Sequence, residues 1–176
     1  MDIEKIFLET IEQLQQGSRP RHRFNKEQLD ALAQHWRSCI NSPKELPKVL
    51  CLVDHLYGDS PHWEELIIQS LKEIKDEELL VLILGISHRQ IINRRVRMGE
   101  RVPFEFIQCF ESLLDHQSPE VLEWSLRTIE QMGSQSIMLK QKVLQRKPGI
   151  RRLFNQHLKY GHEIIEILEK RWNIPL

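Results

Sequence analysis

Hydrophobic residues recur at intervals of three or four positions through most of the chain, and this spacing predicts helices that each bury one face. The pattern is clearest in residues 117–147, where Ser118 is suited to cap a helix and Pro119 to occupy its first position. Glu123, Arg127 and Glu130 are expected on the outer face of this helix. Five residues share the expected inner face: Leu122, Ser125, Leu126, Ile129 and Met132.

A second helix is expected directly after the first, because Gly133 can end a helix by adopting a positive φ. The two segments would form an antiparallel hairpin, whose apolar face needs neighbouring hairpins to cover it. The apolar positions of the second helix are Ile137, Met138, Leu139, Val143 and Leu144.

Comparable helical patterns fill the chain before this hairpin. Segments 3–15 and 25–40 have apolar stripes, and Asn25 is placed to cap the second of them. Residues 60–74 and 77–87 predict another hairpin, and the apolar run 79–84 indicates a helix that is covered on several sides. The most regular stripe lies in the next helix, for which residues 42–45 read as a capping box with Pro43 at the first helical position. Its inward residues are Leu46, Val49, Leu50, Val53, Leu56 and Tyr57.

Two assignments in the second half of the chain depend on weaker signals. Residues 89–98 fit either a separate helix, paired with a helix at 103–116, or an extension of the helix that contains 79–84. After Pro148 and Gly149 we expect two short helices, near 150–158 and 162–172, with a turn between them. The residues expected to be nearly fully buried are Leu50, Val53, Leu82, Phe110, Leu126 and Ile129.

The hairpins in residues 60–147, with proline near helix starts and glycine at the turn, resemble HEAT and armadillo-like repeats. This resemblance implies an all-α fold, a right-handed α-α superhelix of about nine or ten helices. It also implies one repeat domain spanning residues 1–176. Residues 1–58 and 148–176 would supply capping helices, and residues 59–147 the HEAT-like pairs.

The composition is that of an ordinary globular protein, with zero formal net charge and 40% hydrophobic residues. The first residues carry acids and do not resemble a signal peptide, and the longest apolar run is too short to cross a bilayer. Cys39, Cys51 and Cys109 are scattered among apolar residues, as is usual for reduced, buried thiols. We therefore expect a cytoplasmic protein that has no contact with a membrane.

The sequence carries no recognisable catalytic or nucleotide-binding motif, which favours a function other than catalysis. Cys51 and His55 lie four residues apart, beside Asp54, and this spacing can begin a metal site. A second pair of ligands with suitable spacing is missing, so we interpret Cys51 as a core residue. No metal, cofactor or catalytic residue is predicted.

Basic residues are concentrated in three blocks, at residues 19–23, 89–101 and 140–152, and acidic residues in a stretch at 64–78. If consecutive hairpins stack, the second and third blocks would lie on one rim. Three interpretations are open for them: ordinary solvated surface, a site for an acidic protein or peptide, and a nucleic-acid site. Zero net charge and few interleaved aromatic residues disfavour the last of these.

Arginine binds carboxylates and phosphates through pairs of parallel hydrogen bonds. On a continuous helix, Arg94, Arg97 and Arg101 would share one face, and Trp124 falls between the apolar and the charged face of its helix. We therefore predict a non-catalytic adaptor or scaffold that binds an acidic segment or helix of another protein, with a nucleic-acid-binding module as the alternative. The predicted partner-binding residues are Arg89, Arg94, Arg95, Arg97, Arg101, Trp124, Lys140, Arg146, Lys147, Arg151 and Arg152.

Overall fold

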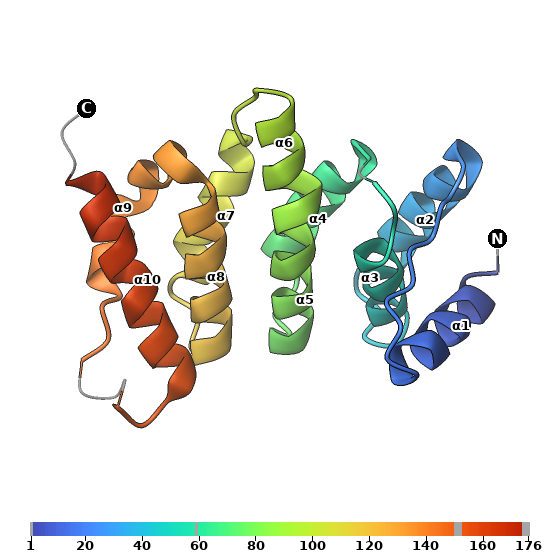
Figure 1. Ribbon diagram of the computed structural model, residues 1–176, viewed down its shortest axis with the longest axis horizontal. Coiled ribbons are helices and arrows are strands. Elements are labelled where there is room, and N and C mark those ends of the chain that lie inside the picture. Colours follow the sequence, from blue (N-terminus) through green and yellow to red (C-terminus); the bar gives the residue numbers. More distant parts are fainter. Residues whose placement is uncertain (1, 59, 150–152, 174–176) are drawn as a thin grey trace. The chain divides into compact units, whose positions relative to one another are not determined.

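The computed structural model describes residues 2–58, 60–149 and 153–173 (Figure 1). Regular secondary structure in these residues is helical, apart from one isolated parallel bridge between His22 and Leu56. The predicted all-α class is therefore confirmed. None of the described helices combines the length and the apolar character that crossing a bilayer requires.

The chain divides into two compact units, Met1–Ile74 and Lys75–Leu176. In the first unit α1 packs on α3, and α2 packs on both α3 and α4. Asp2 caps α1 by accepting a hydrogen bond from the backbone N–H of Lys5, and Asn25 caps α2 as the sequence predicts. The helices of this unit are α1 (Ile3–Gln15), α2 (Lys26–Cys39), α3 (Leu46–Asp54) and α4 (His62–Glu73).

Two tryptophans form the centre of the first unit's core. The rings of Trp36 and Trp63 stack with centroids 6.0 Å apart, and both side chains are fully buried. The indole N–H of Trp36 donates a hydrogen bond of 3.0 Å to the buried hydroxyl of Ser70. This bond satisfies the indole's polar group and joins α2 to α4, since buried donors without partners are costly.

The second unit is built around α8. This helix packs against α5, η1, α7, η2 and α10, and its first turn has the predicted cap, with Ser118 accepting from the backbone N–H of Val121. The elements of the unit are α5 (Glu77–Ser87), the π-helical segment η1 (His88–Asn93), α6 (Arg94–Arg97), α7 (Phe104–Leu113), α8 (Pro119–Gln131), the 3₁₀ segment η2 (Gly133–Leu139), α9 (Lys140–Gln145) and α10 (Gln156–Trp172).

The segments α5, η1 and α6 follow one another without a break (Figure 1). Of the two sequence interpretations, the extension is therefore correct, and residues 89–98 do not form a separate helix. The π-helical segment has a wider turn than an α-helix, which changes the face presented after it. Within the segment, three consecutive residues, Gln90, Ile91 and Ile92, are all buried.

The segment after Gly133 differs from its prediction. It starts as the 3₁₀ segment η2 and becomes α-helical only from Lys140. A 3₁₀ helix has three residues per turn, so the inner face expected for an α-helix is not kept. Ile137 and Met138 are exposed in consequence, while Leu139 and Val143 are buried.

The C-terminal region contains a single long helix where two were predicted. Tyr160 and Gly161, which lie between the two predicted helices, are inside α10. A Cβ atom added at Gly161 would stand 3.3 Å from Cδ1 of Leu126. Glycine at this position therefore permits the close approach of α10 to α8 and does not mark a break. His157 and His162, which fall in different predicted helices, both belong to this one helix.

Most of the predicted core is buried, namely Leu50, Val53, Phe110, Leu126 and Ile129. Besides Ile137 and Met138, three positions were assigned to the wrong environment. Leu82 is 45% exposed because α5 is covered on fewer sides than its apolar run suggested. Glu123, expected outside, is buried under α10. Tyr57 lies beyond the end of α3 at Asp54, so it does not share the inner face of that helix, and it is 65% exposed.

Candidate functional site

The basic block at residues 89–101 extends past the C-terminal end of α6, which is Arg97. Gly99 has a φ of 67°, the N–H of Gly99 donates to the carbonyl of Val96, and the N–H of Glu100 donates to the carbonyl of Arg95. These two bonds form a Schellman cap, in which glycine supplies the left-handed residue. The predicted shared helical face of Arg94, Arg97 and Arg101 is therefore wrong for Arg101, which lies in the connection after the cap.

The arginines of this block differ in exposure. Arg89, Arg94 and Arg95 are half-buried, whereas Arg97 and Arg101 are exposed. Arg95 forms an ion pair of 2.5 Å with Glu100. Glu100, the acidic residue within this block, is thus bound to Arg95 through both its side chain and its backbone N–H.

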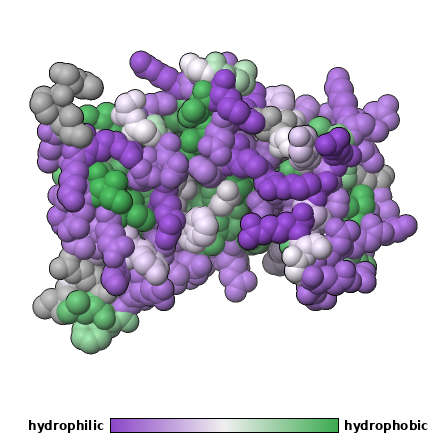
Figure 2. Space-filling view, viewed as in Figure 1, coloured by the Kyte–Doolittle hydropathy of each residue, from purple (hydrophilic) through white to green (hydrophobic). Residues whose placement is uncertain are grey.

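Exposed apolar side chains lie beside these arginines, and sequence analysis did not identify them. Val96 is 67% exposed, Met98 55% and Phe104 54%. Figure 2 shows hydrophobic surface at the top of the view, where Figure 1 places the end of α6. We refer to Val96, Arg97, Met98, Arg101 and Phe104 as the α6–α7 surface. Large exposed apolar groups that lie close together are typical of interaction sites.

The connection between α6 and α7 is fixed by one side chain. Gln135 of η2 accepts a hydrogen bond of 2.8 Å from the N–H of Val102 and donates one of 3.2 Å to its carbonyl. Val102 is itself buried. The α6–α7 surface is therefore carried by an anchored connection, which lowers the entropy that a partner would need to remove on binding.

The second predicted basic block is largely engaged in ion pairs. Lys142 and Arg146 both contact Asp115, and Lys147 contacts Glu169 at 2.7 Å. The hydrogen bond from Lys142 lowers the pKa of the Asp115 carboxyl. Lys140 is half-buried on α9. Arg151 and Arg152 lie outside the described residues, so this block offers less positive surface than its sequence suggests.

A cavity of about 320 Å³ lies next to this block. It is bounded by the start of α8, the end of α9 and the first part of α10, through residues that include His116, Ser118, Leu122, Arg146, Lys147 and Leu158. The cations on its wall are those already paired with Asp115 and Glu169. The cavity therefore has a mixed polar and apolar lining, and the charge of its basic wall is partly neutralised.

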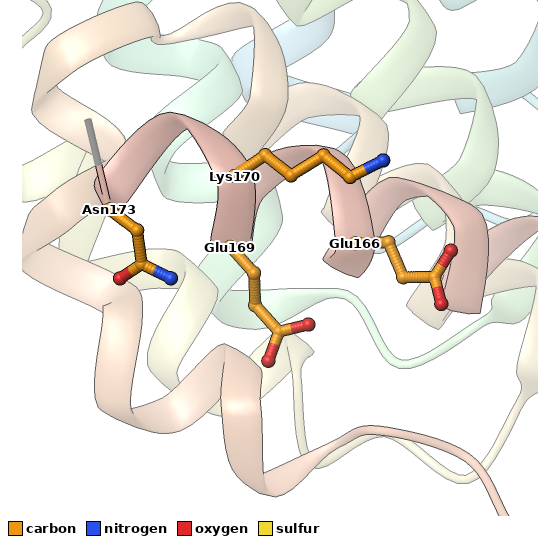
Figure 3. Close-up of a pocket in the computed structure, with 4 residues that line it drawn as sticks. All are labelled: Glu166, Glu169, Lys170 and Asn173. Carbon is orange, nitrogen blue, oxygen red and sulfur yellow. The ribbon is translucent and has the colours of Figure 1, made fainter.

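A second depression, of about 630 Å³, lies along the outer side of α10. Figure 3 shows its lining side chains, Glu166, Glu169, Lys170 and Asn173, all projecting from that one helix. It is a surface hollow beside a helix, and its charged groups have both signs.

Trp124 lies in a network between α8 and α10 that the sequence did not reveal. Its half-buried ring faces Gly85 of α5, and the guanidinium of Arg127 lies 5.9 Å from its centroid and 5.7 Å from that of Tyr160. Arg127 also binds Glu123, which His157 contacts from α10. Trp124 is thus partly used in packing, which reduces the surface that it offers a partner.

In the pair Cys51 and His55, the imidazole nitrogen that is near the thiol is engaged by the backbone. The thiol sulfur lies 4.0 Å from Nδ1 of His55, and this nitrogen lies 2.8 Å from the backbone carbonyl of Cys51. Burial, reinforced by Asp54, raises the pKa of the Cys51 thiol, which disfavours the thiolate that a metal would need. Among the described residues, no three His, Cys, Asp or Glu side chains are grouped to hold a metal ion.

No family model, curated protein or solved structure matches this chain.

Proposed function

We propose that this chain is a non-catalytic adaptor of HEAT-like type, and that its second unit binds an acidic, amphipathic helix of a partner protein at the α6–α7 surface. The observation that carries this proposal is the combination of three exposed apolar side chains with two exposed arginines along the end of α6, the anchored connection and the start of α7. In this proposal the helical hairpins stack as a right-handed superhelix, and the protein works in the cytoplasm.

The apolar side chains would provide most of the binding free energy. Removal of apolar surface from water contributes about 25 cal/mol per Å². Val96, Met98 and Phe104 each have at least half of their surface available for such burial. Methionine adapts to irregular partner surfaces, which suits a helix whose apolar residues recur every three or four positions.

The arginines would select the charge of the partner. Arg97 and Arg101 stand on either side of the cap at Gly99, so a helix lying across the connection would bring its carboxylates to both. Basic residues outnumber acidic ones in the second unit as a whole. A positive field of this kind raises the association rate of an acidic ligand and is weakened by salt.

A binding assay with a defined probe tests the proposal. The probe is a fluorescein-labelled helical peptide whose leucines recur at every third and fourth position and whose remaining positions are rich in glutamate. An isomer of the same composition without this period is the reference peptide. Fluorescence anisotropy should show the periodic peptide binding at least about tenfold more tightly, which corresponds to about 1.4 kcal/mol.

Two pairs of substitutions separate the contributions of apolar and charged residues. Val96→Ser with Met98→Ser, and Arg97→Glu with Arg101→Glu, should each abolish binding of the periodic peptide while the melting temperature stays within a few degrees. The matched controls lie on α10: Ile167→Ser for exposed apolar area, and Lys159→Glu with Lys170→Glu for charge. Equal loss in the control variants would refute a site at the α6–α7 surface.

The same assay distinguishes a nucleic-acid ligand. A labelled DNA duplex that bound more tightly than the peptide, with log affinity falling by about 0.9 per phosphate contact for each unit of log salt concentration, would replace the protein partner by a nucleic acid.

A further inference from the structure

The connection between α1 and α2 has arginines at alternate positions, and both the bridge at His22 and the alternating exposure of its residues indicate an extended backbone. Arg19, Arg21 and Arg23 are all exposed, whereas Pro20 between them is buried and His22 is half-buried. In extended backbone, successive side chains point to opposite sides. The three arginines therefore share the solvent side of the segment, and the residues between them face the helices.

His22 holds this segment in place. Its N–H donates a hydrogen bond of 2.9 Å to the carbonyl of His55, and its carbonyl accepts one of 2.8 Å from the N–H of Tyr57. Nε2 of His22 lies 2.7 Å from the hydroxyl of Thr10, which itself donates to the carbonyl of Ile6. The imidazole N–H is thus the donor to Thr10. These contacts tie the segment to α1 and to the end of α3, so its arginines stand on an ordered backbone.

The spacing of the arginines has a chemical consequence. Alternate residues of an extended chain lie about 6.6 Å apart, so the three side chains span about 13 Å in a row. A second extended chain has the same repeat, and carboxylates at its alternate positions would match the arginines one to one. Each such contact can use the planar, two-pronged geometry that guanidinium and carboxylate share.

An aromatic ring lies at one end of this row. Tyr57 is 65% exposed, and the guanidinium of Arg23 lies 4.6 Å from its ring centroid. The ring orients Arg23 and leaves apolar surface for a neighbouring side chain of a ligand. We refer to Arg19, Arg21, Arg23 and Tyr57 as the arginine strip.

We propose that the arginine strip binds an extended peptide segment of a partner protein, with carboxylates at alternate positions and an apolar residue next to them. Acidic residues outnumber basic ones in the rest of the first unit. A nucleic acid carries a negative charge at every nucleotide, so its phosphates beyond the strip would be repelled by the acidic residues around it. A short peptide places its charges only opposite the arginines. The strip belongs to the first unit and is independent of the α6–α7 surface.

The test uses two labelled nonapeptides of identical composition and the full chain. In the first peptide three glutamates alternate with valines and a leucine follows; in the second the glutamates are contiguous. Contiguous glutamates in an extended chain point to both sides, so only part of them can reach the strip. Fluorescence anisotropy should show the alternating peptide binding at least about fivefold more tightly. Equal affinity of the two peptides, or no binding of either, would overturn the proposal.

Variants then locate the site. Arg19→Glu with Arg21→Glu should abolish binding of the alternating peptide, and Lys44→Glu with Lys72→Glu should leave it unchanged. The control pair lies on the same unit, is exposed and makes the same change in net charge. Replacement of all three arginines by lysine keeps the charge but removes the two-pronged contact, so it should weaken binding severalfold without abolishing it. Unchanged affinity in the first variant would place the peptide elsewhere.

Two further readouts complete the test. Arg97→Glu with Arg101→Glu should not change binding of the alternating nonapeptide, which separates this site from the proposed function of the second unit. A labelled single-stranded oligonucleotide that bound the chain more tightly than the alternating peptide, and lost its binding in Arg19→Glu with Arg21→Glu, would overturn the peptide as the ligand of the strip.

Discussion

His157 Nδ1 on α10 donates a hydrogen bond of 2.7 Å to Oε2 of Glu123 on α8. The carboxylate is almost fully buried, and its other oxygen accepts a bond of 2.7 Å from Nε of Arg127. A buried carboxylate is tolerated when both of its oxygens are paired. This network therefore stabilises the contact between the two helices.

Substitution of Glu123 tests that role. Glu123→Gln removes the charge that pairs with Arg127 and His157, and it should lower the free energy of unfolding by about 1–3 kcal/mol. Both partners are partly exposed, which keeps the loss below that of a fully buried pair. Urea denaturation followed by circular dichroism measures the change. The control Glu111→Gln alters an exposed carboxylate on α7 and should shift the free energy by less than about 0.5 kcal/mol. Equal effects of both substitutions would mean that the network is not stabilising.

Core packing on α8 makes a second prediction. Leu126 is fully buried against α10, and Leu126→Ala should reduce the free energy of unfolding by about 2–5 kcal/mol. Leu82→Ala removes the same atoms at a position that is 45% exposed, and its cost should stay below about 1 kcal/mol. Both variants are compared by chemical denaturation. A larger cost at Leu82 than at Leu126 would contradict the burial described here.

The arrangement of α8 was largely predictable from sequence, because its signals are local and agree with one another. Ser118, Pro119 and Gly133 mark its ends, and its inner stripe is the one that the structure buries. Glu123 was misplaced because its partner His157 lies in a different helix, 34 residues away. The helical pattern predicts contacts only between residues three or four positions apart in the same helix.

The candidate surfaces were predictable in part. The sequence identifies the arginines directly, but the exposure of the side chains beside them depends on where the helices end. The cap at Gly99 separates Arg101 from α6, and the end of α3 at Asp54 exposes Tyr57. The π-helical segment η1 has no composition signal that distinguishes it from an α-helix. A periodic pattern therefore predicts that a helix exists more reliably than it predicts the helix's last turn.

A pH-dependent effect on stability follows from His22. Burial, and then the neighbouring His55, lower the pKa of this imidazole in the folded state below its usual 6.5. Between the two values the unfolded chain binds more protons than the folded one, so stability falls as the pH drops below about 6.5. Below the folded-state pKa the loss is complete and the contribution of His22 becomes constant.

Thermal unfolding of the wild type and of His22→Asn, measured between pH 7.5 and pH 5, isolates this contribution. The asparagine variant should lose less stability on acidification than the wild type, although it is less stable at pH 7.5 because the contact with Thr10 is changed. Parallel pH profiles for the two proteins would show that His22 does not carry the dependence.

The cysteines allow a fourth prediction. Burial raises the pKa of the thiols of Cys39 and Cys51, which disfavours the reactive thiolate. Cys109 is buried and its Sγ donates to the carbonyl of Glu105 at 3.2 Å. Native protein should react with a maleimide reagent at least about tenfold more slowly than protein in urea, as followed by mass spectrometry. Rapid labelling of native Cys51 would mean that the end of α3 opens readily.

The central position of α8 has a consequence for local opening of the second unit. Because α8 packs against α5, η1, α7, η2 and α10, its amide hydrogens can reach solvent only when several of those contacts separate together. The four residues of α6, none of them buried, need no such event. Slow amide hydrogen exchange should therefore be concentrated in α8, at rates that report the global unfolding of its unit, while α6 exchanges through local fluctuations. Val96 and Arg97, the two residues of the α6–α7 surface that belong to α6, would thus lie on an element that can open while the helix that organises its unit stays closed.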